Sequence, residues 1–450
     1  MRARALRSTR DSGVNKTWRA ALSSRTGFGG SLRRSRAVEV GALLIVFGTA
    51  LGVRVWLGGK ILAPWIYSDE ITYSRLAETF ASSGLASGLD ESWSVLGAFG
   101  YPLVVSPAWL TDSSVTSYAI AKGINVGLMT LAAFFVYLMA RRLLAWPWAL
   151  LAAVLSLALP FYTYATALMT ENAFFPVFIL GMFAIILALE KPTLTRQALV
   201  ALAVVVAFAT RVQGFVLAGI ALTSVLLCAV HEASAEQSGG RLQWIIKSIA
   251  RFKLWLVLAP ALALGYVAIK LAQGDSLGSA FGAYSVTTNL GEYSVRDSAR
   301  WILFTFAELS VSVGLVPIAA LIVLFVLAFR GRDFLARRQR IFVFATGSAV
   351  AWLVVQVGVF SSRFAFDQVP QERSVAYVVP LLMVATVVWI ERGLPRPAVA
   401  TALALAVPAI TVIAPPLERM LPFTGNHAFG LFSLWVIQIR LPTGSDEIRA

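Results

Sequence analysis

Long apolar segments recur along most of the chain and are separated by short polar stretches. The hydrocarbon core of a bilayer is about 30 Å thick and takes about 20 helical residues to cross, so each apolar window near that length predicts a membrane-spanning helix. Eleven such windows cover residues 40–59, 116–140, 143–161, 172–190, 197–210, 214–230, 254–273, 302–329, 341–360, 374–390 and 398–414. The pattern predicts an all-α polytopic membrane protein.

Two parts of this pattern are ambiguous. The window 197–210 is short, and only three residues separate it from the window 214–230. A weaker apolar stretch at 429–439 is either a further span or a helix that lies in the membrane interface. The expected number of spans is therefore about 11 to 12.

The composition agrees with this fold class. Of the 450 residues, 58% are hydrophobic and 14% are charged, whereas a soluble domain averages about 45–50% apolar and about 25% charged residues. A soluble enzyme is excluded. The apolar windows predict one membrane domain at 38–440, with a basic, disordered arm before it at 1–37 and a polar tail after it at 441–450.

The charge of the chain is unevenly placed. A formal net charge of +15 would suggest a nucleic-acid partner in a soluble protein. Here the arm and the alternate loops of the same side carry +18, and the rest of the chain carries −3. Cytoplasmic loops are enriched in Lys and Arg, so we expect a multi-pass protein of the cell membrane with a cytoplasmic N-terminus, its site on the outer face and no nucleic-acid partner.

The first outward loop, residues 60–115, opens with the acidic pair Asp69 and Glu70. The apolar spacing that follows predicts a short amphipathic helix on the membrane surface, with Ser68 as its N-cap. Two acids in a first turn also compensate the helix dipole, so a solvated structural pair is the alternative. Nearby aromatic residues, Tyr73 among them, and the adjacent span provide an apolar setting in which a carboxylate can act as a general base.

The end of this loop has its own pattern. Residues 99–107 contain Tyr101, Pro102 and Pro107. The two prolines predict an extended, kinked return path into the second span. A loop that simply re-enters the bilayer is the plainer interpretation.

The next outward loop contains one charged residue, Glu171, which is isolated in sequence between Arg142 and Glu190. A carboxylate at a membrane interface is costly unless it has a partner or a function. We expect a functional role for Glu171. A plain acid at a helix N-terminus, capped by Thr170, is the alternative.

Arginines also stand alone at outward positions. Arg54 lies near the outer end of the first span, Arg211 lies between two apolar windows, and Arg373 lies at the mouth of the tenth window. Such side chains often extend to lipid headgroups. Because guanidinium binds phosphate through two hydrogen bonds and stays charged, a phosphate clamp is the sharper interpretation.

Together these segments resemble the GT-C superfamily of integral-membrane glycosyltransferases, and most closely its protein O-mannosyltransferase and aminoarabinose-transferase branch. The resemblance is most specific at residues 69–77, which are similar to the acidic-pair motif of that branch. Residues 211–214 and 372–380 are similar to segments that these enzymes carry after later spans. The resemblance implies a GT-C fold with a juxtamembrane helix in the first outward loop.

The resemblance also implies transfer of a sugar from a polyprenyl-phosphate donor to a hydroxyl of a glycan, lipid or protein acceptor on the non-cytoplasmic face. Asp69 matches the general base and Glu70 its neighbour in the site. Glu171 matches a second acidic position that holds the acceptor, and Tyr73 and Tyr101 would organise the site. The residues expected to bind the donor phosphate are Arg54, Arg211, Arg373 and Tyr377.

Other functions fit part of the pattern. A transporter or a lipid flippase for a glycolipid would also be polytopic, but the distinctive acids lie in loops at one face and no internal repeat is visible. A non-catalytic membrane scaffold is a third candidate. The sequence leaves open the sugar, the acceptor, and whether Mg²⁺ or Mn²⁺ binds between the acids and the substrate phosphate.

Overall fold

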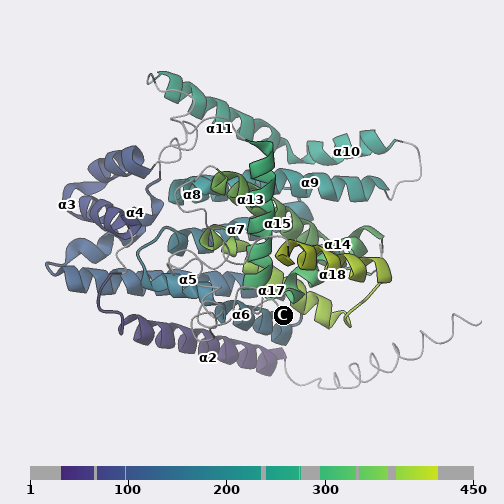
Figure 1. Cartoon of the computed structure of the whole chain (residues 1–450), viewed down its shortest axis with the longest axis horizontal. Helices are drawn as coiled ribbons and strands as arrows, with labels where there is room; N and C mark the ends of the chain where they lie inside the picture. The colour runs from purple at the N-terminus through teal and green to yellow at the C-terminus, as the bar shows by residue number, and fades with distance from the viewer. Residues whose placement is uncertain are drawn as a thin grey trace, which may run out of the picture. The chain divides into compact units, whose positions relative to one another are not determined.

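The structure, a computed structural model, describes residues 32–64, 68–96, 98–234, 240–272, 274, 294–330, 334–362 and 371–413. Every regular element in these ranges is a helix, as predicted (Figure 1). The chain divides into two compact units, Met1–Thr49 and Ala50–Ala450. In the first unit, helix is described from Leu32 onward. The site described below belongs entirely to the second unit.

The helices follow one another with short connections. The longer ones are α2 (Leu32–Gly58), α3 (Ser68–Leu96), α5 (Ser114–Arg141), α6 (Trp146–Leu157), α7 (Glu171–Glu190), α8 (Leu194–Thr210), α9 (Val216–Ser234), α11 (Lys253–Ala272), α13 (Val295–Ser312), α14 (Val316–Arg330), α15 (Arg337–Ser361), α17 (Val379–Glu391) and α18 (Ala398–Ile413). The shorter ones are α4 (Gly100–Val105), η1 (Ser106–Leu110), η2 (Pro160–Thr166), η3 (Val212–Phe215), α10 (Arg241–Ile249), η4 (Ala250–Phe252), α16 (Glu372–Val375) and η6 (Ala376–Val378).

Six helical stretches in the described part of the chain are long and apolar enough to cross a membrane. They are Arg36–Gly58, Ser114–Arg141, Glu171–Glu190, Val212–Ser234, Arg337–Ser361 and Glu372–Glu391. Two bent helix pairs raise the number to eight if each pair is one span. Several long apolar helices therefore confirm the predicted multi-pass architecture, with fewer full-length spans among the described residues than the eleven apolar windows.

The window 302–329 is not one straight helix, contrary to the prediction. It is divided between α13 and α14, whose axes differ by 110°. Gly314 ends α13 in the left-handed conformation, with φ +69°, and Pro317 stands in the first turn of α14. A left-handed glycine ends a helix and an early proline starts one. The window 143–161 is bent in a similar way, by 61° between α6 and η2, and Pro160 begins η2.

The first outward loop also differs from the prediction. The helical segment that begins at Ser68 is longer than predicted: α3 reaches Leu96, but Gly84 has non-helical backbone angles (φ +85°, ψ −179°) and divides it into two helices. The return segment is helical rather than extended. Pro102 falls in the first turn of α4 and Pro107 in the first turn of η1, positions where the missing amide hydrogen costs no helical hydrogen bond.

The predicted arm and tail lie mostly outside the described residues. Residues 1–31, the stretch 429–439 and the tail 441–450 are not described. Residues 32–37, predicted to belong to the disordered arm, instead form the beginning of α2. They contain no proline or glycine, so nothing in them prevents the apolar helix from extending toward the N-terminus.

Helices α7 and α17 supply much of the core. All ten residues from Val379 to Val388 in α17 are buried, and most of α7 is buried as well. Tyr377, just before α17, packs edge-on against Phe174 of α7 with 4.7 Å between ring centroids. The first turn of α7, which carries Glu171, is therefore held in a fixed position by the aromatic packing below it.

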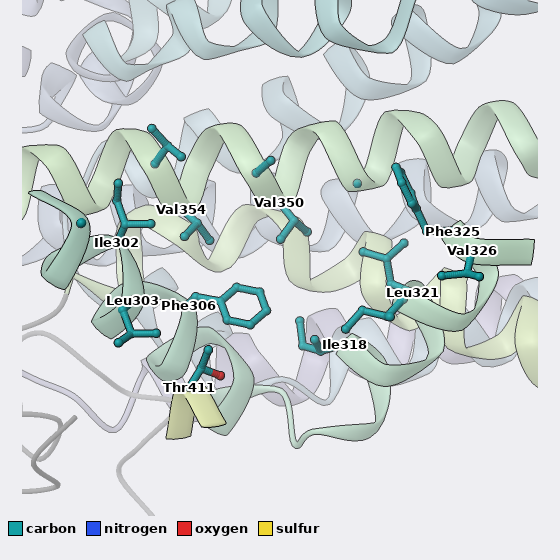
Figure 2. A pocket seen from close by; sticks show the side chains of 15 residues that line it. Ile302, Leu303, Phe306, Ile318, Leu321, Phe325, Val326, Val350, Val354 and Thr411 are labelled. Atoms are coloured by element: carbon teal, nitrogen blue, oxygen red, sulfur yellow. The ribbon is translucent and has the colours of Figure 1, made fainter. Parts of the chain in front are cut away.

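An apolar pocket of about 640 Å³ opens where α13 and α14 bend apart. Its walls come from α13, α14, α15 and α18 (Figure 2). Figure 2 shows Phe306, Val350 and Leu321 around the space, with Thr411 as the one labelled polar side chain. The pocket is a direct consequence of the bend, because two helices at a steep angle cannot fill the space between them.

Candidate functional site

Four charged side chains meet at the N-terminal end of α7 and form what we call the ionic cluster: Asp69, Glu171, Arg211 and Arg373. The Arg211 Nη1 lies 2.6 Å from Glu171 Oε1. The Arg373 Nε lies 3.6 Å from the same carboxylate oxygen, and its Nη1 lies 3.3 Å from Asp69 Oδ2. Arg373 thus bridges the two acids. The structure brings together four residues that the sequence singled out separately.

The segment before α7 positions Glu171. The Glu70 Oε1 accepts a hydrogen bond of 2.9 Å from the Leu168 amide. The carbonyl of Ala167 accepts hydrogen bonds from the side-chain amides of Asn125 and Asn172, at 3.0 and 2.9 Å. Three buried side chains from α3, α5 and α7 therefore fix this turn.

Thr170 has a different role from the predicted cap. It stands before the first residue of α7, but its side chain makes no capping hydrogen bond to the helix. Instead, its hydroxyl donates to Glu171 Oε2 at 3.3 Å and accepts from Arg211 Nη1 at 3.2 Å. A charged neighbour is a stronger hydrogen-bond partner than a backbone amide, which explains why the hydroxyl turns toward the cluster.

Arg211 is positioned by the end of a helix. It is the first residue after α8 and has extended backbone angles, so its side chain leaves the helix axis. Its Nη2 donates to the Ser374 hydroxyl at 3.2 Å, and the neighbouring Gln213 donates to the Ser374 carbonyl at 2.8 Å. These contacts tie η3 to α16, which carries Arg373.

Gly214 lets the chain turn back against α8. A Cβ at this position would lie 2.3 Å from the carbonyl carbon of Ala207, closer than any side chain tolerates. The Gly214 amide donates to the Arg211 carbonyl at 2.7 Å. The tight turn that presents Arg211 therefore requires glycine.

The two acids of the predicted pair face different surroundings. The Asp69 side chain is 41% exposed and contacts Arg373. Glu70, one residue later, is 1% exposed and holds the Leu168 amide. Successive residues of a helix point about 100° apart, which separates a reachable carboxylate from a buried one. Asp69 can meet a substrate without rearrangement, whereas Glu70 cannot.

Tyr73 and Tyr101 form the wall of the cluster toward α4. Their rings pack edge to face with 5.5 Å between centroids. Burial, followed by the charges of Asp69 and Glu171, raises the pKa of the Tyr73 phenol well above its ordinary value. Burial likewise raises the pKa of Tyr101, whose hydroxyl donates to Asn125 at 3.2 Å. Both phenols therefore stay neutral and act as hydrogen-bonding groups.

Two predicted phosphate ligands are engaged in other contacts. Arg54 donates to the Leu157 carbonyl at the end of α6 and covers the ring of Tyr162 at 4.4 Å. Tyr377 is 1% exposed and packs among the phenylalanines of α7. Their contacts fix helix ends and core packing, so the arginines that remain available at the site are Arg211 and Arg373.

Within the described ranges, no three His, Cys, Asp or Glu side chains gather closely enough to hold a metal ion. The two carboxylates of the ionic cluster are instead paired with the guanidinium groups of Arg211 and Arg373. A divalent cation would have to compete with these arginines for the same oxygens.

Sequence reasoning missed three polar residues of the site, namely Thr170 as a direct partner of the cluster, Gln213 and Ser374. Each lies within two residues of a predicted charged residue. A hydroxyl or amide beside an isolated charge at a span end is the signal that could have found them.

No family model, curated protein or solved structure matches the chain.

Proposed function

We propose that the chain is a glycosyltransferase that moves a sugar from a polyprenyl-phosphate donor to an acceptor hydroxyl at the membrane surface. One observation carries the proposal: an exposed carboxylate, Asp69, lies within 3.3 Å of Arg373, and a second arginine, Arg211, shares Glu171 with it. A base beside two phosphate-binding groups at the end of apolar helices suits a lipid-linked phosphate ester.

In the proposed reaction, the acceptor oxygen attacks the anomeric carbon as its proton passes to Asp69. The bond between that carbon and the phosphate oxygen breaks, and polyprenyl phosphate leaves with the electron pair. Arg373 and Arg211 stabilise the charge that develops on the leaving phosphate, an interaction that is stronger in a site sheltered from water. When Arg373 binds the phosphate, its ion pair with Asp69 is broken. The Asp69 carboxylate is then free to accept the proton.

The remaining predicted residues have supporting roles in this proposal. Glu171 holds the two arginines in place, because both guanidinium groups contact its Oε1. Glu70 is a positioning residue that fixes the turn before α7 through Leu168. Tyr73 and Tyr101 line the site from the side of α3 and α4.

The pocket between α13 and α14 supports a lipid-linked donor. It is almost entirely apolar and opens between candidate spans, as a polyprenyl chain requires. Helix α13 packs against α16, the helix that carries Arg373. We propose that the polyprenyl chain lies in this pocket. The GT-C fold, the site on the outer face and the cytoplasmic N-terminus are parts of the same proposal.

A transporter or glycolipid flippase is the second candidate, and one observation favours it. Two helix pairs are bent by 61° and 110°, and broken helices are typical of substrate sites in transporters. The discriminating measurement is incubation of the purified full chain with radiolabelled polyprenyl-phosphate sugars in detergent. An enzyme releases polyprenyl phosphate or transfers the sugar, whereas a flippase leaves the donor intact.

The sharpest variant is Asp69→Asn, which removes the base and keeps the shape. General-base catalysis contributes about 10²–10⁴ in rate, so we expect sugar transfer to fall by about that factor at an unchanged expression level. Asp112→Asn is the matched control, since Asp112 is an exposed acid of the same outward loop, and should retain activity. Wild-type turnover by Asp69→Asn would contradict the assignment.

A further inference from the structure

A second charged cluster surrounds the C-terminal end of α7 and plays no part in the proposed reaction. Four arginines, Arg142, Arg196, Arg337 and Arg338, contact the last turn of this helix; we call them the arginine cluster. They come from the ends of α5 and α15 and from the first turn of α8. Two of them, Arg142 and Arg338, contact the carboxylate of Glu190, which is 7% exposed.

The contacts of the cluster are short and converge on few acceptors. Arg142 Nη2 lies 2.5 Å from Glu190 Oε2, and Arg338 Nε lies 3.8 Å from Glu190 Oε1. Arg337 donates to the Glu190 carbonyl at 2.9 Å. Arg196 donates to the Leu187 carbonyl at 2.5 Å. Four guanidinium groups thus share one carboxylate and two carbonyl oxygens.

The charges of this cluster do not balance. Four arginines face a single carboxylate, and the end of a helix adds only about half a negative charge. The Nε of Arg142 and the Oε1 of Glu190 are both buried, with no hydrogen-bond partner in the described ranges. The Arg338 side chain is 58% exposed and Arg142 is 30% exposed, so the surplus positive charge is accessible from outside.

The cluster lies at the ends of three candidate spans. Helices α5, α7 and α15 are all candidate spans, and their ends meet here. Helix α7 has 20 residues, which at about 1.5 Å per residue measures about 30 Å, the thickness of a bilayer core. Because α7 is long enough to span the bilayer and carries one cluster at each end, the ionic cluster and the arginine cluster would lie at opposite membrane surfaces.

We propose that the arginine cluster is a binding site for the phosphate of an anionic phospholipid in the leaflet that it faces. Guanidinium groups bind phosphate through paired hydrogen bonds, and basic pockets between spans bind anionic headgroups. Topology alone requires positive charge in the loops of one side. It does not require four arginines to converge on one helix end, two of them with partly exposed side chains.

The test uses the purified full chain in detergent, titrated with phosphatidylglycerol or with phosphatidylcholine of the same acyl chains. Lipids bound are counted by native mass spectrometry. We expect a clear preference for phosphatidylglycerol, and the double variant Arg142→Gln/Arg338→Gln should bind it about thirtyfold more weakly, which is about five- to sixfold per arginine. The matched control Arg241→Gln/Arg251→Gln removes two arginines from α10 and η4 and should stay within about twofold.

A second variant separates binding from folding. Glu190→Gln removes the competing carboxylate, so phosphatidylglycerol should bind severalfold more tightly, whereas a merely structural cluster would loosen and bind it less. Three results would overturn the proposal: equal binding of the two lipids, equal losses in the cluster pair and the control pair, or displacement of phosphatidylglycerol by an equal concentration of free glycerol phosphate.

Discussion

The two carboxylates of the ionic cluster differ in their exposure to solvent, and this difference decides their roles. Asp69 is 41% exposed and Glu171 is 5% exposed. Both contact Arg373, but Glu171 also contacts Arg211. A buried carboxylate with two guanidinium partners stabilises its surroundings, whereas an exposed one with a single partner is available to a substrate.

This difference predicts unequal effects on stability. Glu171→Gln leaves two guanidinium groups without their shared charge, and breaking a buried ion pair costs about 3–5 kcal/mol. Asp69→Asn loses one partly exposed pair and should cost at most about 1 kcal/mol. The free energy of unfolding, measured by SDS titration in mixed micelles, checks both values. A loss for Asp69→Asn that equals the loss for Glu171→Gln would contradict the assigned roles.

The sequence identified the charged residues of the site more successfully than the polar residues that contact them. Glu171, Arg211 and Arg373 stood out because ionised groups are rare in apolar surroundings. Thr170 and Ser374 did not, because hydroxyls are common at helix ends and their direction is set by the tertiary contact. Glu70 was paired with Asp69 in sequence, yet the helix turns its side chain to the interior.

At the scale of elements, η3 is the part of the site that tolerates least change. Its close approach to α8 fixes the direction in which Arg211 leaves the helix end. The Arg211 carbonyl is held by the Gly214 amide, and Gln213 is bound to the backbone of α16. Any change that widens this turn therefore moves Arg211 away from Glu171.

We predict that Gly214→Ala destabilises the protein by about 1–3 kcal/mol, because the added methyl group would overlap the backbone of Ala207. The same SDS titration measures the effect. Gly127→Ala in α5 is the matched control, since no atom lies within 4 Å of its added Cβ. Glycine in a helix interior is unfavourable relative to alanine, so the control should be neutral or slightly stabilised. Equal losses in both variants would refute the packing argument.

The helices that are defined by a long apolar window were predicted correctly. The breaks at which the chain changes direction were missed. Long apolar windows gave α5, α7, α9, α15 and α17 within a few residues. The division of the window 302–329 was missed because hydropathy ignores Gly314 and Pro317, which end one helix and begin the next. Proline was likewise interpreted as a sign of extended chain at Pro102, although in a first turn it favours helix.

At the scale of the whole molecule, α7 joins two polar clusters of different character. Its N-terminal end carries a balanced set of two acids and two arginines, and its C-terminal end carries one acid among four arginines. An excess of arginine is typical of the cytoplasmic side. The orientation expected from the charge distribution therefore predicts on which side of the membrane each end of α7 lies, and this can be tested.

If α7 crosses the membrane, exposed residues of α3, the helix that carries Asp69, and residues next to Arg196 in α8 should react from opposite sides of the membrane. In a Cys228→Ser background, which removes the single native cysteine, Ser83→Cys in α3 and Thr195→Cys in α8 place thiols at exposed positions. A membrane-impermeant maleimide should label Ser83→Cys in intact cells and Thr195→Cys only after permeabilisation, because α7 separates their surfaces by about 30 Å of hydrocarbon. Labelling of both thiols from the same side would refute the transmembrane placement of α7, and the reverse pattern would refute only the cytoplasmic assignment of the arginine cluster.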